Sequence, residues 1–76
     1  NPFTNTTQIG YVLPEGGNVV LTMFDLTGKQ LFNQTIAGVK GLNRIEISKD
    51  QIAAQGMIYY QVQFQGYTAT KKMLIL

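Results

Sequence analysis

The sequence predicts an all-β fold, a small antiparallel β-sandwich of immunoglobulin-like type with about six to seven strands. Short stretches of alternating apolar and polar residues recur along the chain, and turn residues separate them. Only residues 48–56 look helical, and they suffice for one or two turns. With 76 residues and no cysteine, the chain is one small domain whose stability must come from β packing or from a neighbouring domain.

The first half of the chain predicts three strands. Ile9, Tyr11 and Leu13 alternate with less apolar neighbours, and Pro14 with the following glycines then forces a turn, which we expect to be a hairpin turn. Residues 18–25 are apolar on both faces, which is typical of a strand that is covered on both sides. We expect a type I turn over residues 25–28 and a hairpin that joins residues 18–25 to a third strand at 30–36.

A fourth strand is predicted over residues 42–48, with Arg44 and Glu46 on its solvent face. The helix-like stretch follows and ends at Gly56, a residue type that commonly terminates helices. Within this stretch, Ile52 is the residue that we expect to reach the core.

The last third of the chain predicts a β-hairpin with a two-residue turn at Gln65-Gly66. This turn sets the register, which pairs Phe64 with Tyr67, Val62 with Ala69, Tyr60 with Lys71, Ile58 with Met73, Gln63 with Thr68, Gln61 with Thr70, Tyr59 with Lys72 and Met57 with Leu74. Lys71 thereby falls on the otherwise apolar inner face. We expect either that it extends along Tyr60 to the rim or that a bulge shifts the register.

Composition argues against several classes of function. There is no histidine or cysteine, so the commonest general base, the thiol nucleophile and the usual zinc ligands are missing. The four carboxylates fall on predicted turns or on a solvent face, so we expect a non-catalytic protein without cofactor or metal. The basic residues are scattered, which is unlike a nucleic-acid-binding face, and the longest apolar run is four residues, too short to span a membrane.

Two surface features leave a binding role open. The four tyrosines fit β propensity and core filling, but an exposed row of them, with Tyr59 facing outward, would suit a carbohydrate. Residues 71–76 join a basic pair to an apolar strand, whose edge or end a partner can recognise. An edge strand can also pair with a copy of itself, so a homodimer is a further expectation.

The order and spacing of several short motifs carry a family resemblance. These motifs are Asn1-Pro2-Phe3, Ile9-Gly10-Tyr11-Val12-Leu13-Pro14, Gly17-Asn18-Val19-Val20-Leu21, Phe24-Asp25-Leu26-Thr27-Gly28-Lys29, Gly41, Gly56-Met57-Ile58-Tyr59 and Lys72-Met73-Leu74-Ile75. Together they resemble the type A C-terminal sorting domain of the Bacteroidota type IX (Por) secretion system, over essentially the whole chain. The layout is also similar to an immunoglobulin-like domain associated with flagellar hook-capping proteins and bacterial surface enzymes. The strand Arg44-Ile45-Glu46-Ile47-Ser48 departs from the aromatic-acidic step that is frequent in these families, and it weakens the flagellar-type match more.

The resemblance implies a secretion signal. Residues 1–76 would be a single C-terminal sorting domain, excised from a longer secreted protein whose N-terminal cargo passes from the periplasm through the type IX outer-membrane translocon. A sortase-like peptidase would then act on it, and the cargo would be secreted or attached to the cell surface. The implied recognition residues are Lys71, Lys72, Met73, Leu74 and Ile75, and the implied structural signature residues are Asp25, Gly28, Gly56 and Tyr59. The alternative is a structural or carbohydrate-binding immunoglobulin-like module of a secreted bacterial enzyme.

Overall fold

The computed structural model describes residues 2–3, 5–52 and 54–76, with the backbone alone described for residues 2–3. These residues form strands and one short 3₁₀ helix. The elements are β1 (Pro2–Phe3), β2 (Thr6–Leu13), β3 (Gly17–Phe24), β4 (Gln30–Gly38), β5 (Gly41–Ser48), η1 (Lys49–Gln51), β6 (Gly56–Phe64) and β7 (Tyr67–Ile75).

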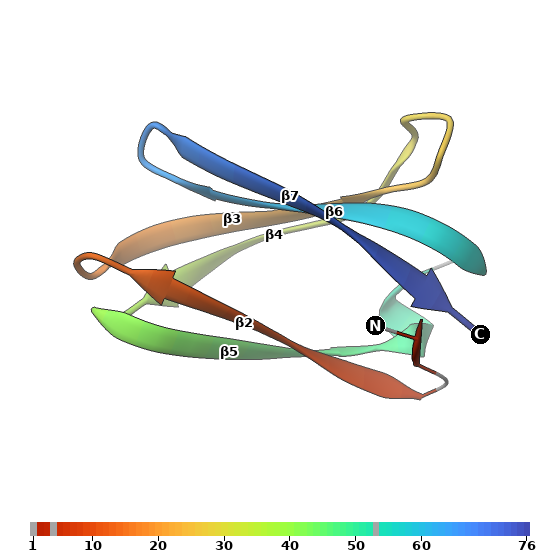
Figure 1. Cartoon of the computed structure of the whole chain (residues 1–76), viewed down its shortest axis with the longest axis horizontal. Helices are drawn as coiled ribbons and strands as arrows, with labels where there is room; N and C mark the ends of the chain where they lie inside the picture. The colour runs from red at the N-terminus through yellow and green to blue at the C-terminus, as the bar shows by residue number, and fades with distance from the viewer. Residues whose placement is uncertain (1, 4, 53) are drawn as a thin grey trace.

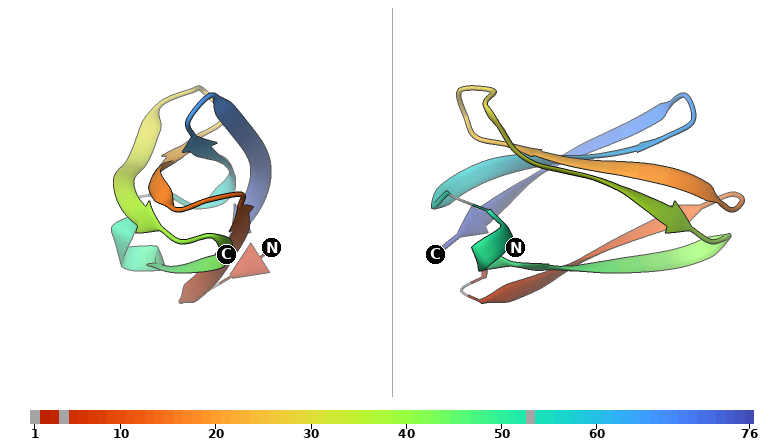
Figure 2. Two further views of the ribbon diagram at one scale, coloured as in Figure 1. Left: turned by 90° about the vertical axis from the view of Figure 1, so that its left-hand side faces the viewer. Right: turned by 180° about the vertical axis from the view of Figure 1, so that it is seen from behind.

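The strands form two sheets that pack face to face, which confirms the predicted β-sandwich (Figure 1). One sheet has the order β1-β7-β6-β3-β4 and the other pairs β2 with β5. Figure 2 shows the two layers from one end and from behind. All pairings are antiparallel except the short one between β1 and β7. The neighbours β3-β6-β7 opposite β2-β5 correspond to the C-F-G and B-E strands of immunoglobulin-type sandwiches.

The closing hairpin adopts the predicted register. All eight residue pairs from Phe64–Tyr67 to Met57–Leu74 are present, without a bulge. Gln65 has a φ of 53°, so the turn takes its positive φ at the first loop position. The side chain of Gln65 donates a 3.1 Å hydrogen bond to Glu15, which ties the hairpin tip to the turn between β2 and β3.

The core lies between the two sheets and draws on both. Its larger cluster of buried residues consists of Ile9, Leu21, Met23, Ile47, Ile52, Ile58, Tyr60, Met73 and Ile75. A smaller cluster near the hairpin tip consists of Leu13, Val19 and Phe64. Ile52 is 3% exposed and belongs to the larger cluster, so the prediction that it reaches the core is confirmed.

Two connections differ from a simple series of hairpins. We expected the turn at Pro14 to Gly17 to be a hairpin turn, but it links β2 in one sheet to β3 in the other. Likewise, β4 and β5 lie in different sheets. The Asn43 side chain closes this second connection. Its Nδ2 donates hydrogen bonds to the main-chain oxygens of Val39 and Gly41, and its Oδ1 accepts one from the main-chain amide of Val39.

The second sheet covers β3 on one face only. Val19, Leu21 and Met23 are buried against the second sheet, as expected. On the opposite face, Thr22 is 5% exposed and accepts a hydrogen bond from the Asn33 side chain, but Val20 and Phe24 are only half-buried, because the described chain supplies no third layer. A strand can therefore be apolar on both faces when neighbouring side chains in its own sheet shelter the outer one.

Candidate functional site: the surface around strand β7

The five predicted recognition residues divide into two groups along β7. Met73 and Ile75 are each 1% exposed and belong to the core. Lys71 and Lys72 are exposed, and Leu74 is half-buried. Side chains alternate between the faces of a strand, so Lys72 and Leu74 share the outer face of the sandwich. A partner that binds the folded domain meets these side chains and not those of Met73 and Ile75.

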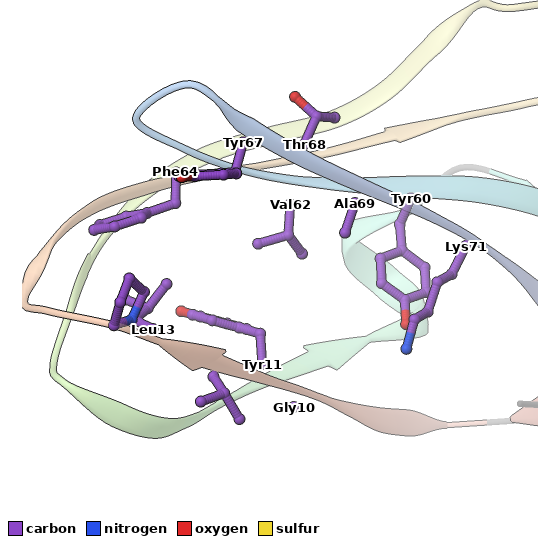
Figure 3. Close-up of a pocket in the computed structure, with 12 residues that line it drawn as sticks. Gly10, Tyr11, Leu13, Tyr60, Val62, Phe64, Tyr67, Thr68, Ala69 and Lys71 are labelled. Carbon is purple, nitrogen blue, oxygen red and sulfur yellow. The ribbon is translucent and has the colours of Figure 1, made fainter.

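Lys71 lies on the inner face, as the register requires, yet it is exposed. On the inner face of β7, Met73 is buried among residues of both sheets, whereas Tyr67, Ala69 and Lys71 are exposed. Figure 3 shows the Lys71 side chain extended beside the ring of Tyr60 toward the space between β7 and β2. The expectation that Lys71 reaches the rim along Tyr60 is therefore confirmed, and its alternative, a bulge, is absent from this hairpin.

On the outer face, Lys72 lies opposite Tyr59 of β6. The Lys72 ammonium is 5.9 Å from the centre of the Tyr59 ring, within the range of a cation–π interaction. Tyr59 faces outward as expected, and it is half-buried beneath this lysine and its neighbours. The basic pair of the tail thus displays one ammonium on each face of the sheet.

Three of the four signature residues meet at one end of this outer face. Asp25, Gly28 and Tyr59 line a shallow hollow beside the end of β3. In the turn, Asp25 Oδ1 accepts hydrogen bonds from the Thr27 hydroxyl (2.6 Å), the Thr27 amide (2.9 Å) and the Lys29 amide (3.0 Å). The Gly28 amide donates to the Asp25 carbonyl at 3.1 Å, which confirms the predicted turn. Gly28 has a φ of +89°, a conformation that favours glycine.

These contacts change the acidity of Asp25. The Thr27 hydroxyl is the largest cause, and with the amides of Lys29 and Thr27 it holds the pKa of the Asp25 carboxyl below its usual 3.8. Gly56, the fourth signature residue, lies apart from this hollow at the start of β6, opposite Ile75, with a φ of +88°.

A contact that sequence reasoning missed ties down the end of β7. The Lys49 ammonium, on η1, donates a 2.6 Å hydrogen bond to the main-chain oxygen of Leu76. The Lys49 amide itself donates to the carbonyl of Asn5 at 2.7 Å. Residues 49 and 76 are far apart in sequence and share no local pattern, so Lys49 looked like one scattered charge among several.

A second hollow is an open groove of about 430 Å³ between β2 and the β6–β7 hairpin. Figure 3 shows Tyr11 and Leu13 of β2 on one side, with Val62 and Phe64 of β6 on the other. Tyr60 and Tyr67 also line it, whereas Tyr59 lies on the opposite face, so the four tyrosines do not form one row. Burial raises the pKa of the Tyr60 hydroxyl above its usual 10.0.

The described residues gather no three histidine, cysteine, aspartate or glutamate side chains into a cluster that could hold a metal ion. In the same residues, no helix has the length and apolar character that crossing a bilayer requires. Among their buried side chains, every polar atom has a hydrogen-bond partner.

Comparison with known proteins gives one match. The family model described as the secretion system C-terminal sorting domain matches residues 1–76, the whole chain. Comparisons with curated proteins and with solved structures gave no match. The match agrees with the resemblance carried by the sequence motifs, and such a signal serves export through the type IX system. The chain belongs to the family of secretion-system C-terminal sorting domains.

Proposed function

We propose that this chain is the C-terminal sorting domain of a larger secreted protein and that it directs an N-terminal cargo through the type IX outer-membrane translocon. The domain crosses the periplasm with its cargo, and a sortase-like peptidase acts on it at the cell surface. The cargo is then released or attached to that surface. The domain itself performs no catalysis and needs no cofactor. The family match over residues 1–76 is the observation that carries this proposal.

The geometry of β7 supports separate roles for the five recognition residues. We assign contact with the secretion machinery to Lys71, Lys72 and Leu74, whose side chains are exposed or half-buried. Met73 and Ile75 hold the strand in place, because they lie in the core with residues from both sheets. Asp25, Gly28, Gly56 and Tyr59 are assigned structural roles in the turns and on the outer face.

The test is an export assay in a Bacteroidota host, with a reporter that carries a signal peptide and this domain at its C-terminus. Deletion of residues 71–76 is expected to retain the reporter in the cell envelope. This deletion also removes the buried Met73 and Ile75, so it does not separate recognition from folding. The decisive variant is therefore the double substitution Lys72→Glu and Leu74→Glu, which leaves the core intact.

We expect this variant to lower the exported fraction about tenfold, which corresponds to a loss of about 1.4 kcal/mol of recognition free energy. The matched control is Leu42→Glu, an exposed position (58%) on the other sheet, which is expected to be exported normally. Circular dichroism of both purified domains checks that they fold. Normal export of the folded double variant would contradict the assignment of Lys72 and Leu74, and normal export of the 71–76 deletion would contradict the sorting function.

A further inference from the structure

We propose that the groove between β2 and the β6–β7 hairpin binds an extended segment of another polypeptide, which adds to the free edge of β7. The segment inserts apolar side chains between the two sheets and places a carboxylate beside Lys71. The proposal rests on the edge, the lining and the charge of the groove, and it does not depend on the secretion function.

The first argument is the unpaired edge of β7. On one side, β7 pairs with β6 along its whole length. On the other side, the only partner among the described residues is β1, which pairs with Leu74 and Ile75. Phe64 and Tyr67 close a two-residue hairpin, so residues 67, 69 and 71 direct their main-chain groups toward β6. By alternation, Thr68, Thr70 and Lys72 direct their N–H and C=O groups toward the open edge, where an added strand can bond to them.

The second argument is the lining of the groove beneath that edge. Its walls come from β2 and β6, and Figure 3 shows Tyr11, Val62 and Phe64 facing the space between them. Tyr67 and Ala69 of β7 border the same space and are exposed. Because side chains alternate along a strand, every second residue of an added strand would point into this space. Valine, isoleucine or leucine at those positions would cover apolar surface that the described chain leaves open.

The third argument is charge. Lys71 is the one charged residue that lines the groove, and none of the lining residues is acidic. An aspartate or glutamate on the inward face of the added strand would complement it. A second copy that paired through its own β7 fits less well, because the charged residues of that strand are Lys71 and Lys72. The groove therefore favours an acidic partner segment over self-association.

The two ends of the edge limit the length of the segment. At one end, β1 already occupies the positions beside Leu74 and Ile75. At the other, the hairpin turn is tied to Glu15 through Gln65. Between them, residues 67–72 leave space for an added strand of about six residues, or roughly 20 Å.

The test is an NMR titration of the isotope-labelled 76-residue chain with two capped six-residue peptides. In both peptides, valines and one glutamate share one face of the extended strand, and threonines occupy the opposite face. The two peptides differ in the position of the glutamate, which is near the N-terminus in the first and near the C-terminus in the second. We expect one peptide to shift the signals of Tyr11 and Val62 and to slow amide exchange at Thr68, Thr70 and Lys72. Replacing its glutamate by lysine is expected to weaken binding about fivefold, which is the upper end of the range of contributions that solvent-exposed ion pairs make.

Charge reversal in the protein provides the matched variants. Lys71→Glu is expected to lose affinity for the glutamate peptide and to regain it for the lysine peptide, whereas Lys40→Glu, in the exposed β4–β5 connection, should keep the original preference. Three results would overturn the proposal. The first is the absence of shifts with either peptide at about 1 mM, since a Kd of about 1 mM corresponds to a binding free energy of only about −4.1 kcal/mol. The second is protection of the β7 edge that depends on protein concentration alone. The third is a set of groove shifts produced by a cello-oligosaccharide without protection of Thr70.

Discussion

Asp25 shows how one side chain of this domain organises a turn. A single carboxylate oxygen accepts three hydrogen bonds from Thr27 and Lys29, and the main chain closes around it through Gly28. All donors come from within four residues, so the turn chemistry was visible in the sequence. The position of this turn beside Tyr59, on the rim of the same hollow, depends on the fold and could not be predicted from the sequence.

The lowered pKa of Asp25 predicts a pH-dependent contribution to stability. Because its folded pKa lies below the usual 3.8, the contribution is fully present above pH 3.8 and is lost as the pH falls through the folded value. Asp25→Ala is expected to lower the urea midpoint at pH 7, and the difference from the parent chain should shrink below pH 3.8. Asp50→Ala, an exposed position on η1, is the control. Equal differences at pH 7 and pH 2.5 would contradict an ionised Asp25 as the source.

Lys71 illustrates a limit of reasoning from sequence at this scale. The two-residue turn and the period of two placed it correctly on the inner face. Its exposure depends on how far the second sheet extends over β7, and the strands of that sheet, β2 and β5, lie far from β7 in sequence. Sequence periodicity specifies the face of a residue but not whether a second sheet covers that part of the face.

At the scale of elements, prediction succeeded where pairing is local. The β6–β7 and β3–β4 hairpins form as expected, because each has a short turn and strands that determine the register between them. The prediction of a hairpin at the β2–β3 connection was wrong. The residues around Pro14 indicate that the chain reverses direction, but they do not indicate which sheet the next strand joins. The pairing of β1 with β7 was also missed, because two residues carry no periodicity.

Close approach of two elements makes Gly38, at the end of β4, intolerant of a side chain. A Cβ atom there would lie 2.5 Å from Leu13 Cδ1 and 3.2 Å from the main-chain oxygen of Gly17. Gly38→Ala is therefore expected to lower the free energy of unfolding by about 1–3 kcal/mol through overpacking of the smaller core cluster. Urea unfolding followed by circular dichroism measures this change.

The control for this prediction is Gly10→Ala in β2. A Cβ atom there meets its nearest neighbour at 3.8 Å, which is an ordinary contact. We expect this variant to be at least as stable as the parent chain, since alanine loses less backbone entropy than glycine on folding. A Gly38→Ala variant as stable as the Gly10→Ala variant would show that Leu13 moves aside at little cost.

The whole molecule depends on one core that both sheets share. The β2–β5 pair contributes Ile9 and Ile47 to the cluster that also holds Met73 and Ile75 of β7. A two-stranded sheet is marginally stable by itself, and without it the five-stranded sheet would expose Met73 and Ile75 to water, so neither layer is expected to persist without the other. The domain should consequently unfold as one cooperative unit.

Ile47→Ala tests this cooperativity. The side chain is 0% exposed, and its truncation is expected to lower the free energy of unfolding by about 2–5 kcal/mol. Native-state hydrogen exchange should show the same loss of protection for amides of β7 as for those of β5, although Ile47 lies in the other sheet. Leu42→Ala, exposed on the same strand, should change neither. Retained protection in β7 would indicate that the larger sheet is stable independently.

The alternation of burial along β7 couples recognition of the tail to its conformational equilibrium. A receptor that recognises Lys72 and Leu74 in the arrangement that the folded strand gives them binds only the folded population, so its apparent affinity scales with the folded fraction. A domain that is half folded would lose only a factor of about two in affinity, whereas each further 1.4 kcal/mol of destabilisation would lose about tenfold. The affinity of a receptor that binds the side chains of Met73 and Ile75 would instead rise as the domain is destabilised, because both side chains leave the core only on unfolding. The sign of the correlation between domain stability and export therefore identifies whether the machinery contacts the accessible side chains of β7 or the two that the core buries.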